Sequence, residues 1–356
     1  MLKSKVLCSI LLFSMGLNAE TINIKDDVVV EVDANTTSRK SDDVKFALEI
    51  GAKTDFWNPG LSGNVLNYDT EGLFLGFGKL KVKIYDSDVF TIEKYGTLSS
   101  SDGQDDLLAQ HKSDQKQDST IDGMRISLQL MEVINYLFDK DWLDGFNYEF
   151  NTRNFIGTAT LLQNSAYWVG RTNNAVLNRD FYLLERGNDL SFKTKFTSHK
   201  LSYKFDNIIK KIKGSYASVG IFDEEWSKPT FIGDTALNGE LPVVFDSNYY
   251  SKGVSGAVGV KKDNYNIKAY FDYGVDNEMK IIQKGGDYAN YNKDVDIYAM
   301  GLKADYKFVD VYSNNSFSTD IIVGAGMQYN QITQDGDIEL DAETLYGVNA
   351  GIEVTF

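Results

Sequence analysis

The sequence predicts an all-β fold, an antiparallel up-and-down barrel of about twelve strands, from two observations. Apolar and polar residues alternate in many segments, and a period of two is typical of a strand with one apolar and one polar face. Short and long connections also alternate along the chain, as in a barrel that turns tightly at one end and carries loops at the other. Twelve segments fit the first pattern, and the weaker ones leave a range of ten to fourteen.

The last eleven residues show the alternation most clearly. One face carries Tyr346, Val348, Ala350, Ile352, Val354 and Phe356, and the other face carries small or polar residues. About ten tilted residues are enough for a strand to cross a bilayer. This strand, with an aromatic residue at its end, resembles the C-terminal signature of bacterial outer-membrane β-barrels. The resemblance implies a transmembrane barrel that the last strand closes, and an assembly signal read by the barrel-assembly machinery: Tyr346, Ile352, Val354 and Phe356.

Eleven further strands are expected before this one. They cover 44–56, 72–85, 89–98, 123–138, 145–158, 189–205, 211–222, 251–261, 265–275, 294–308 and 317–330. Each clear strand has an apolar face, such as Phe46, Leu48 and Ile50 in the first and Leu80, Val82 and Ile84 in the second. The same pattern gives Ile126 and Leu128, Tyr148 and Phe150, Phe192 and Phe196, Phe271 and Tyr273, Leu302 and Tyr306, and Val323 and Met327. The strands over 89–98, 189–205 and 211–222 have weaker patterns.

The connections between these strands predict the topology. Short turns are expected near 86–88, 139–144, 206–210, 262–264 and 309–316. Long loops are expected near 57–71, 99–119, 159–188, 223–250, 276–293 and 331–343. In outer-membrane barrels the short turns face the periplasm and the long loops face outward. We therefore expect both ends of the barrel domain on the periplasmic side.

The N-terminus predicts export. Lys3 and Lys5 precede a mostly apolar stretch over 6–17, and a cleavage site follows at 17–19. We expect a signal peptide over 1–19, an acidic periplasmic leader over 20–43 and the barrel over 44–356. Cys8, the only cysteine, would leave with the signal, so disulfide chemistry is not expected. The resemblance places the protein in the outer membrane of a Gram-negative bacterium, in contact with its lipids and lipopolysaccharide.

The distribution of charge suggests an ion-selective pore. The chain carries a net charge of −15, with its acids concentrated in the expected loops and the leader. On the polar faces of the strands, however, basic residues outnumber acidic ones, which predicts a cation-lined interior that favours anions. The candidate pore-lining residues are Lys79, Lys81, Lys83, Arg125, Arg153, Lys193, Lys195, Glu49 and Glu353. The alternative for the three clustered lysines is ordinary filling of the lumen, paired with Glu49 and Asp55.

The last expected loop carries five acids at alternate positions. They are Asp335, Asp337, Glu339, Asp341 and Glu343. Carboxylates suit hard cations, so this rim could bridge divalent cations to lipopolysaccharide or another ligand. The alternative is a solvated loop.

Catalysis finds little support in the sequence. His111 and Ser113 resemble the His-x-Ser arrangement of outer-membrane phospholipases, but Asp114 and Gln115 depart from the pattern that follows it. No cofactor, metal site or nucleic-acid surface is expected. The favoured function is therefore a porin-like channel for small hydrophilic solutes, including anionic ones, in a monomer or a homo-oligomer. The alternatives are a surface-binding, adhesin-like barrel and, more remotely, a lipid hydrolase.

Overall fold

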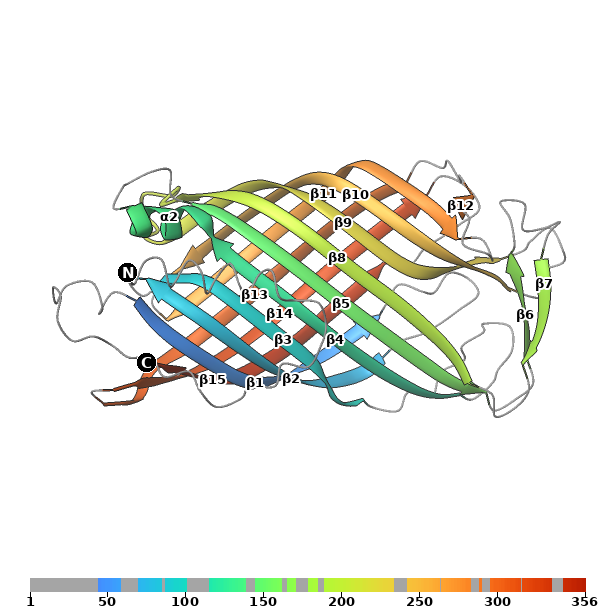
Figure 1. The fold of residues 1–356 in the computed structure, drawn as a ribbon, viewed down its shortest axis with the longest axis horizontal. Coiled ribbons are helices and arrows are strands. Elements are labelled where there is room, and N and C mark those ends of the chain that lie inside the picture. Colours follow the sequence, from blue (N-terminus) through green and yellow to red (C-terminus); the bar gives the residue numbers. More distant parts are fainter. Residues whose placement is uncertain are drawn as a thin grey trace.

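The computed structural model is a closed antiparallel barrel of twelve strands (Figure 1). It describes residues 44–58, 70–84, 87–100, 115–138, 145–161, 165–170, 179–184, 189–233, 242–262, 264–282, 288–289, 295–314, 316–334 and 342–356. The barrel strands are β1 (Val44–Asn58), β2 (Thr70–Ile84), β3 (Ser87–Ser100), β4 (Gln115–Gln129), β5 (Phe146–Leu161), β8 (Asp189–Asp206), β9 (Ser215–Gly233), β10 (Pro242–Lys261), β11 (Tyr265–Ile282), β13 (Val295–Ser313), β14 (Ser318–Gln334) and β15 (Glu343–Thr355). The expected fold and strand count are therefore confirmed.

Three short strands lie outside the barrel wall. β6 (Ser165–Gly170) and β7 (Arg179–Leu184) form a hairpin attached to β10, and β12 (Tyr288–Ala289) pairs with β11. All three lie at the end of the barrel opposite the C-terminus (Figure 1). We call that end the loop end. The other end is the turn end, where 85–86, 130–145, 207–214, 262–264 and 314–317 connect the strands.

The first and last strands close the barrel. β1 and β15 pair antiparallel from Ala47 opposite Thr355 to Asn58 opposite Thr344. Beyond this ladder, the Phe356 amide donates to the Phe46 carbonyl at 2.8 Å. No strand edge is left open along this seam, as a barrel in lipid requires, because lipid cannot satisfy free backbone groups.

The period of two sorts side chains to the two faces of the wall. In β1, Phe46 and Ile50 are 51% and 62% exposed, whereas the intervening Ala47 and Glu49 are 1% exposed. In β15, Ile352 is 54% exposed and Glu353 only 1%. Residues on the exposed apolar face point outward and the others point into the lumen. A soluble protein would bury such a belt, so the wall is built to face lipid.

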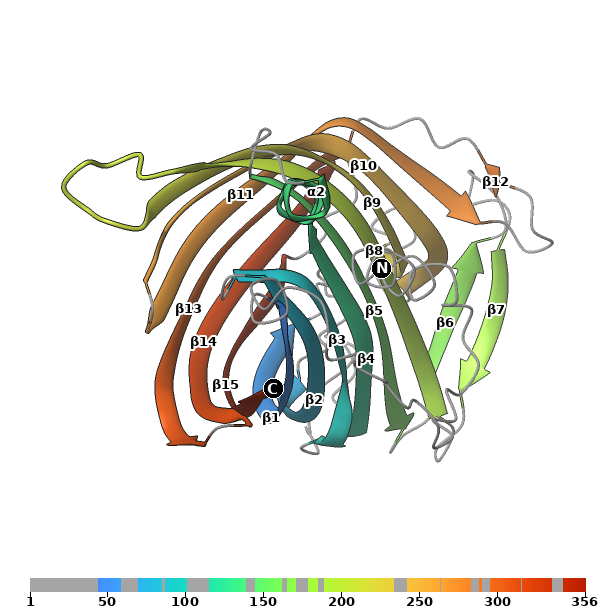
Figure 2. The same cartoon turned by 60° about the vertical axis from the view of Figure 1, so that its left-hand side comes forward.

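One expected strand is too long. The chain leaves the sheet after Gln129 and forms the helix α2 (Leu130–Phe138) at the turn end (Figure 2). Leu130, Val133 and Ile134 follow the i, i+3, i+4 spacing of one helix face, which replaces the alternation seen up to Gln129. Val133 packs with Val82 and Phe90, and this cluster covers the outer face of β2 and β3 near the turn end. The expected short turn at 139–144 is thus part of a longer connection.

Another expected loop is largely strand. β9 and β10 remain paired from Val260 opposite Ser215 to Pro242 opposite Gly233, so most of the loop expected over 223–250 is a long hairpin. The pairing of β8 with β9 ends at Ser227. Pro229 lies beyond that end, so its lack of an N–H group costs no hydrogen bond to β8. The expected strict alternation of short turns and long loops therefore fails at two connections. Among the described residues, no helix is long and apolar enough to cross a membrane.

Candidate functional site

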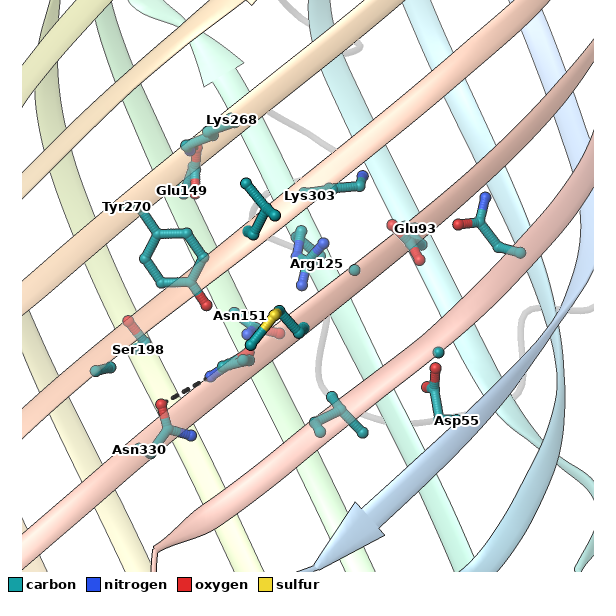
Figure 3. A pocket seen from close by; sticks show the side chains of 18 of the residues that line it. Asp55, Glu93, Arg125, Glu149, Asn151, Ser198, Lys268, Tyr270, Lys303 and Asn330 are labelled. Carbon is teal, nitrogen blue, oxygen red and sulfur yellow. Dashed lines mark hydrogen bonds and ion pairs between the residues drawn. The ribbon is translucent and has the colours of Figure 1, made fainter.

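The lumen contains a cavity of about 410 Å³ near the middle of the barrel. Inward residues of strands from all around the wall line it, and Figure 3 shows ten of them labelled. Its basic residues are Lys53, Lys79, Arg125, Lys200, Lys268 and Lys303, and its acidic residues are Asp55, Glu93, Glu149, Glu224 and Asp272. The lining is therefore nearly balanced in charge, rather than dominated by cations as the sequence suggested.

The three clustered lysines do lie on the inner wall, but acids neutralise them. Lys79 Nζ lies 2.8 Å from Glu49 Oε1, and Lys81 Nζ lies 2.7 Å from Glu49 Oε2. Lys81 also pairs with Glu353, and Lys83 Nζ lies 2.6 Å from Glu353 Oε1. Both glutamates are 1% exposed, so each needs the cations around it. This network matches the alternative of a filled lumen, with Glu353 in the place expected for Asp55.

The network continues onto two more strands near the turn end. Lys307 of β13 lies 2.9 Å from Glu353 Oε1 and 2.5 Å from Asp320 Oδ2 of β14. Register explains the cluster, because Asp320, Glu353, Glu49 and Lys79 stand opposite one another in successive strands. One row of inward positions thus crosses four neighbouring strands, and the ion pairs tie these strands together beside the closing seam.

Two cations face each other across the cavity. Arg125 lies on β4 and Lys303 on β13, six strands apart in either direction around the wall. Both side chains point inward and are exposed inside the barrel (Figure 3). Lys303 pairs with Asp305 at 3.3 Å. Among the described residues, no carboxylate oxygen lies within 4.0 Å of the Arg125 guanidinium. We call Arg125 and Lys303 the facing pair.

A second group of contacts crosses the lumen towards the loop end. Arg153 of β5 donates a hydrogen bond to Glu343 of β15, and Asn330 Nδ2 donates to Glu343 Oε2 at 3.0 Å. The guanidinium of Arg153 also lies 5.4 Å from the ring centre of Phe196 and 5.9 Å from that of Trp226. Charge and aromatic rings together narrow the lumen at this height.

The opposite side of the cavity is acidic. Glu224 is 6% exposed and accepts a hydrogen bond from Ser198 Oγ at 3.0 Å. Asp272 binds Lys200 Nζ through Oδ2 at 2.6 Å, while its buried Oδ1 has no hydrogen-bond partner among the residues that the structure describes. Lys268 lies 3.9 Å from Glu149, which connects β11 to β5 across the lumen. Acids outnumber bases by three to two on this side of the cavity.

Towards the loop end the inner wall becomes apolar. Leu73, Leu75, Phe155, Tyr249 and Met279 point inward and are between 0 and 2% exposed. The sequence analysis expected polar residues on the inner faces. In β2 and β10 apolar residues occur on both faces, so the sequence pattern does not tell inward apolar residues from lipid-facing ones. The lumen thus passes from an ionic cluster at the turn end, through the charged cavity, to an apolar layer.

Lys193 and Lys195 lie on the wrong side of the wall for pore lining. In β8 the inward positions carry Phe196, Ser198 and Lys200, so the two lysines face outward, where both are exposed. The expectation treated Phe192 and Phe196 as the lipid-facing set. Phe196 instead packs against Trp226 inside the barrel, with ring centres 4.3 Å apart and the ring planes tilted by 54°. An aromatic residue that packs in the lumen reverses the apparent phase of its strand.

The remaining site residues fall in three places. Tyr346, Ile352 and Phe356 are exposed on the outer face, and Tyr346 stacks on Phe56 with ring centres 5.1 Å apart. Val354 shares their face and is half-buried. Glu343 is buried inside the barrel with Arg153, so it is not part of an external acidic rim. His111 and Ser113 lie outside the described residues. So do the other four rim acids, Asp335, Asp337, Glu339 and Asp341.

The sequence analysis missed two aromatic residues that shape the cavity, Tyr270 and Trp226, which both line it. Their positions in β11 and β9 have inward parity, which the alternation with Phe271 and Ile221 could have indicated. Lys303 also lines the cavity, and it lies on a polar strand face that the sequence expected to point inward. Within the described part of the chain, no group of three or more His, Cys, Asp or Glu residues could hold a metal ion.

Comparison with known proteins finds similarity only among solved structures. No protein-family model matches the sequence, and no curated protein matches it. Among solved structures, the translocator domain of the autotransporter NalP from Neisseria meningitidis aligns over 88% of this chain and 89% of its own, with 8% identity and a TM-score of 0.34. The CymD monoaromatic hydrocarbon channel aligns over 87% and 88%, with 9% identity and a TM-score of 0.31. The outer-membrane protease OmpT from Escherichia coli aligns over 90% and 99%, with 10% identity and a TM-score of 0.28.

Proposed function

We propose that the protein is an outer-membrane channel for the passive diffusion of small hydrophilic solutes, with a preference for anions. The facing pair carries this proposal, because Arg125 and Lys303 project from opposite walls into one charged cavity. A solute that crosses the middle of the barrel would pass between them. Their charges attract anions at short range, where low-dielectric walls strengthen the field.

The rest of the lining determines how strong the preference is. Lys79, Lys81 and Lys83 contribute little, because Glu49 and Glu353 neutralise them. Glu224 and Asp272 on the other side oppose the facing pair. We therefore propose a modest anion preference that falls as salt rises, since ions screen charges over about 8 Å at physiological ionic strength.

Reversal potentials in planar bilayers test the proposal. The full-length protein should conduct, and in a potassium chloride gradient its reversal potential should indicate that chloride passes more readily than potassium. Arg125→Gln and Lys303→Gln should each shift the reversal potential towards cations. Lys195→Gln is the matched control, since it removes the same charge from an exposed position on the outer face. Equal shifts in all three variants, or a cation preference in the native protein, would contradict the proposal.

A surface-binding barrel is the second candidate, and the apolar layer at the loop end favours it. Leu73, Leu75 and Met279 fill inner positions with side chains that are at most 2% exposed. A lumen packed in this way conducts poorly. In that case the folded protein would show no conductance in bilayers, and the native chain and Arg125→Gln would be indistinguishable.

The proposed location follows from the wall itself. The exposed apolar belt and the closed seam suit the outer membrane of a Gram-negative bacterium, and a signal peptide over 1–19 would provide export. Outer-membrane lipids, lipopolysaccharide and the assembly machinery are the proposed partners. Fractionation of cells, with N-terminal sequencing of the mature protein, tests both the location and the cleavage site.

A further inference from the structure

A charged patch interrupts the apolar outer face over β2, β3 and β4. Lys94 of β3 points outward and is exposed. It lies within the apolar belt, because Ile92 precedes it and Leu98, which is 65% exposed, follows it on the same face. Lys94 stands opposite Met124 in β4, and two residues along that strand Asp122 also points outward and is exposed.

A lysine in this position is costly without a partner. Within the bilayer, charged groups are rare and usually face another protein group or a cavity. Among the described residues, neither Lys94 nor Asp122 forms an ion pair. Within the described part of the chain, Asp122 accepts a side-chain hydrogen bond from Asn154 Nδ2 alone, at 3.2 Å. The barrel by itself therefore leaves a cation and an anion close together on its lipid-facing side.

The wall beside these charges is bare. Gly78 stands opposite Lys94, and Gly76 stands opposite Gly96, which in turn stands opposite Asp122. An added Cβ at Gly78 would meet nothing within 4 Å, and at Gly96 its nearest neighbour would be 3.9 Å away. Gly78 and Gly96 therefore leave open space on the outer face, whereas at Gly76 an added Cβ would lie 3.2 Å from the Leu98 side chain. Small residues such as Gly78 and Gly96 allow two protein surfaces to approach closely in a membrane.

We propose that this outer patch, made of Gly78, Lys94, Gly96 and Asp122, is the contact surface for a second copy of the chain. A two-fold axis along the membrane normal brings one patch against itself, so that residue i of one copy meets residue j of the other and the reverse. A patch with one cation and one anion is then self-complementary, with Lys94 of each copy against Asp122 of its partner. The glycines let the two walls come close enough for both pairs to form. This inference does not depend on the proposed function.

Cysteine crosslinking tests the contact directly. In a Cys8→Ser background, which has no other cysteine, Gly78→Cys in the outer membrane should give a dimer under oxidation or with a short bis-maleimide. Val258→Cys is the matched control: Val258 is 55% exposed on β10, six strands from β2 around the barrel. Dimers from Gly78→Cys alone support the proposal. If Gly78→Cys gives no dimer, or if both variants give equal amounts of dimer, the patch is not an interface between copies.

A charge exchange identifies the pair that holds the interface. Lys94→Asp and Asp122→Lys should each weaken crosslinking at Gly78→Cys by about tenfold or more, because each brings like charges together. The double variant with both changes should restore it. If Lys94 instead reaches a phosphate of an outer-leaflet lipid, the double variant will not restore crosslinking. If it pairs with Asp122 of its own barrel, no dimer will form in any variant. A shift in gel mobility on heating verifies that each variant is folded.

Discussion

Arg153 on β5 is bonded to Glu343 on β15, although four strands of the barrel wall lie between them. The two side chains are 6% and 4% exposed, and Asn330 completes the hydrogen bonding of the carboxylate. Neighbouring strands already hold each other by their ladders, so a contact of this kind adds something different. It supports the wall from inside, and it also occupies space that a solute would need.

Removal of one member of this pair should be far more damaging than removal of both. Arg153→Met leaves a buried carboxylate without its cation and should cost about 3–5 kcal/mol, whereas Arg153→Met with Glu343→Met should recover most of that loss. Denaturant unfolding in detergent measures both. As a control, Lys204→Met breaks the exposed pair with Asp206 and should cost under about 1 kcal/mol. If the double variant is no more stable than the single one, the pair is not a coupled unit.

The same pair should limit the flow of solutes. Arg153→Ser with Glu343→Ser shortens both side chains and removes the ionic contact across the lumen. Single-channel conductance of this variant should exceed that of the native protein, with little change in ion preference because the net charge is unchanged. Unaltered conductance in a correctly folded variant would place the narrowest point of the path elsewhere, with the apolar layer of Leu73 and Leu75 as the next position to test.

The lysine cluster should matter for folding more than for selectivity. Lys81 bridges Glu49 and Glu353, so Lys81→Met should destabilise the barrel by about 3–5 kcal/mol. Lys303→Met, which removes an exposed lysine inside the cavity, should cost under about 1 kcal/mol and shift the reversal potential instead. The two measurements, unfolding and reversal potential, should therefore rank the two variants in opposite orders. The same ranking in both would mean that the cluster is part of the permeation path.

Assembly should depend on the outer face of β15. Ile352→Asp puts a carboxylate into lipid. A lipid-facing Lys or Arg near mid-bilayer costs about 2–4 kcal/mol, and Asp costs somewhat less. A loss of this kind should block assembly. The folded, heat-modifiable form on gels should therefore be reduced strongly. Asn349→Asp introduces the same charge on the inner face of the same strand and should assemble normally. Equal assembly of both variants would argue that Ile352 does not meet lipid.

The orientation of the barrel can be checked on intact cells. A protease site inserted in the connection 234–241, at the loop end, should be cut from outside. The same site in the connection 262–264, at the turn end, should be cut only after the membrane is opened. Cleavage of the second site on intact cells would reverse the topology.

The sequence was informative wherever lipid faces the chain. A period of two with exposed apolar residues defined β1, β13, β14 and β15 closely, because lipid imposes one simple rule on every second residue. It was less informative inside the barrel. Phe196 and Trp226 pack in the lumen, so the apolar set of β8 gave the wrong phase for Lys193 and Lys195. Any strand that is apolar on both faces loses the contrast on which the pattern depends.

Contacts between distant strands were the other limit. Glu343 looked like one of five loop acids, because its partner Arg153 is 190 residues away in the chain. The sequence also could not show that Arg125 and Lys303 face each other. Whether β4 and β13 lie on opposite sides of the barrel depends on the strand count and on the register around the whole wall. By contrast, the helix α2 was present in the sequence as a change of period after Gln129, and a shorter window would have separated it from β4.

The seam between β1 and β15 has a consequence for how the chain folds. Its partners, such as Leu48 and Val354, are among the most distant in the sequence, so closure carries a large loop entropy and is expected to be slow. Until β15 docks, β1 and β14 are exposed edges that other chains can pair with. A shorter version of the protein without β15 would thus be an aggregation-prone open sheet and not a smaller barrel. Whatever escorts this chain to the membrane has to shield those two edges for as long as the seam is open.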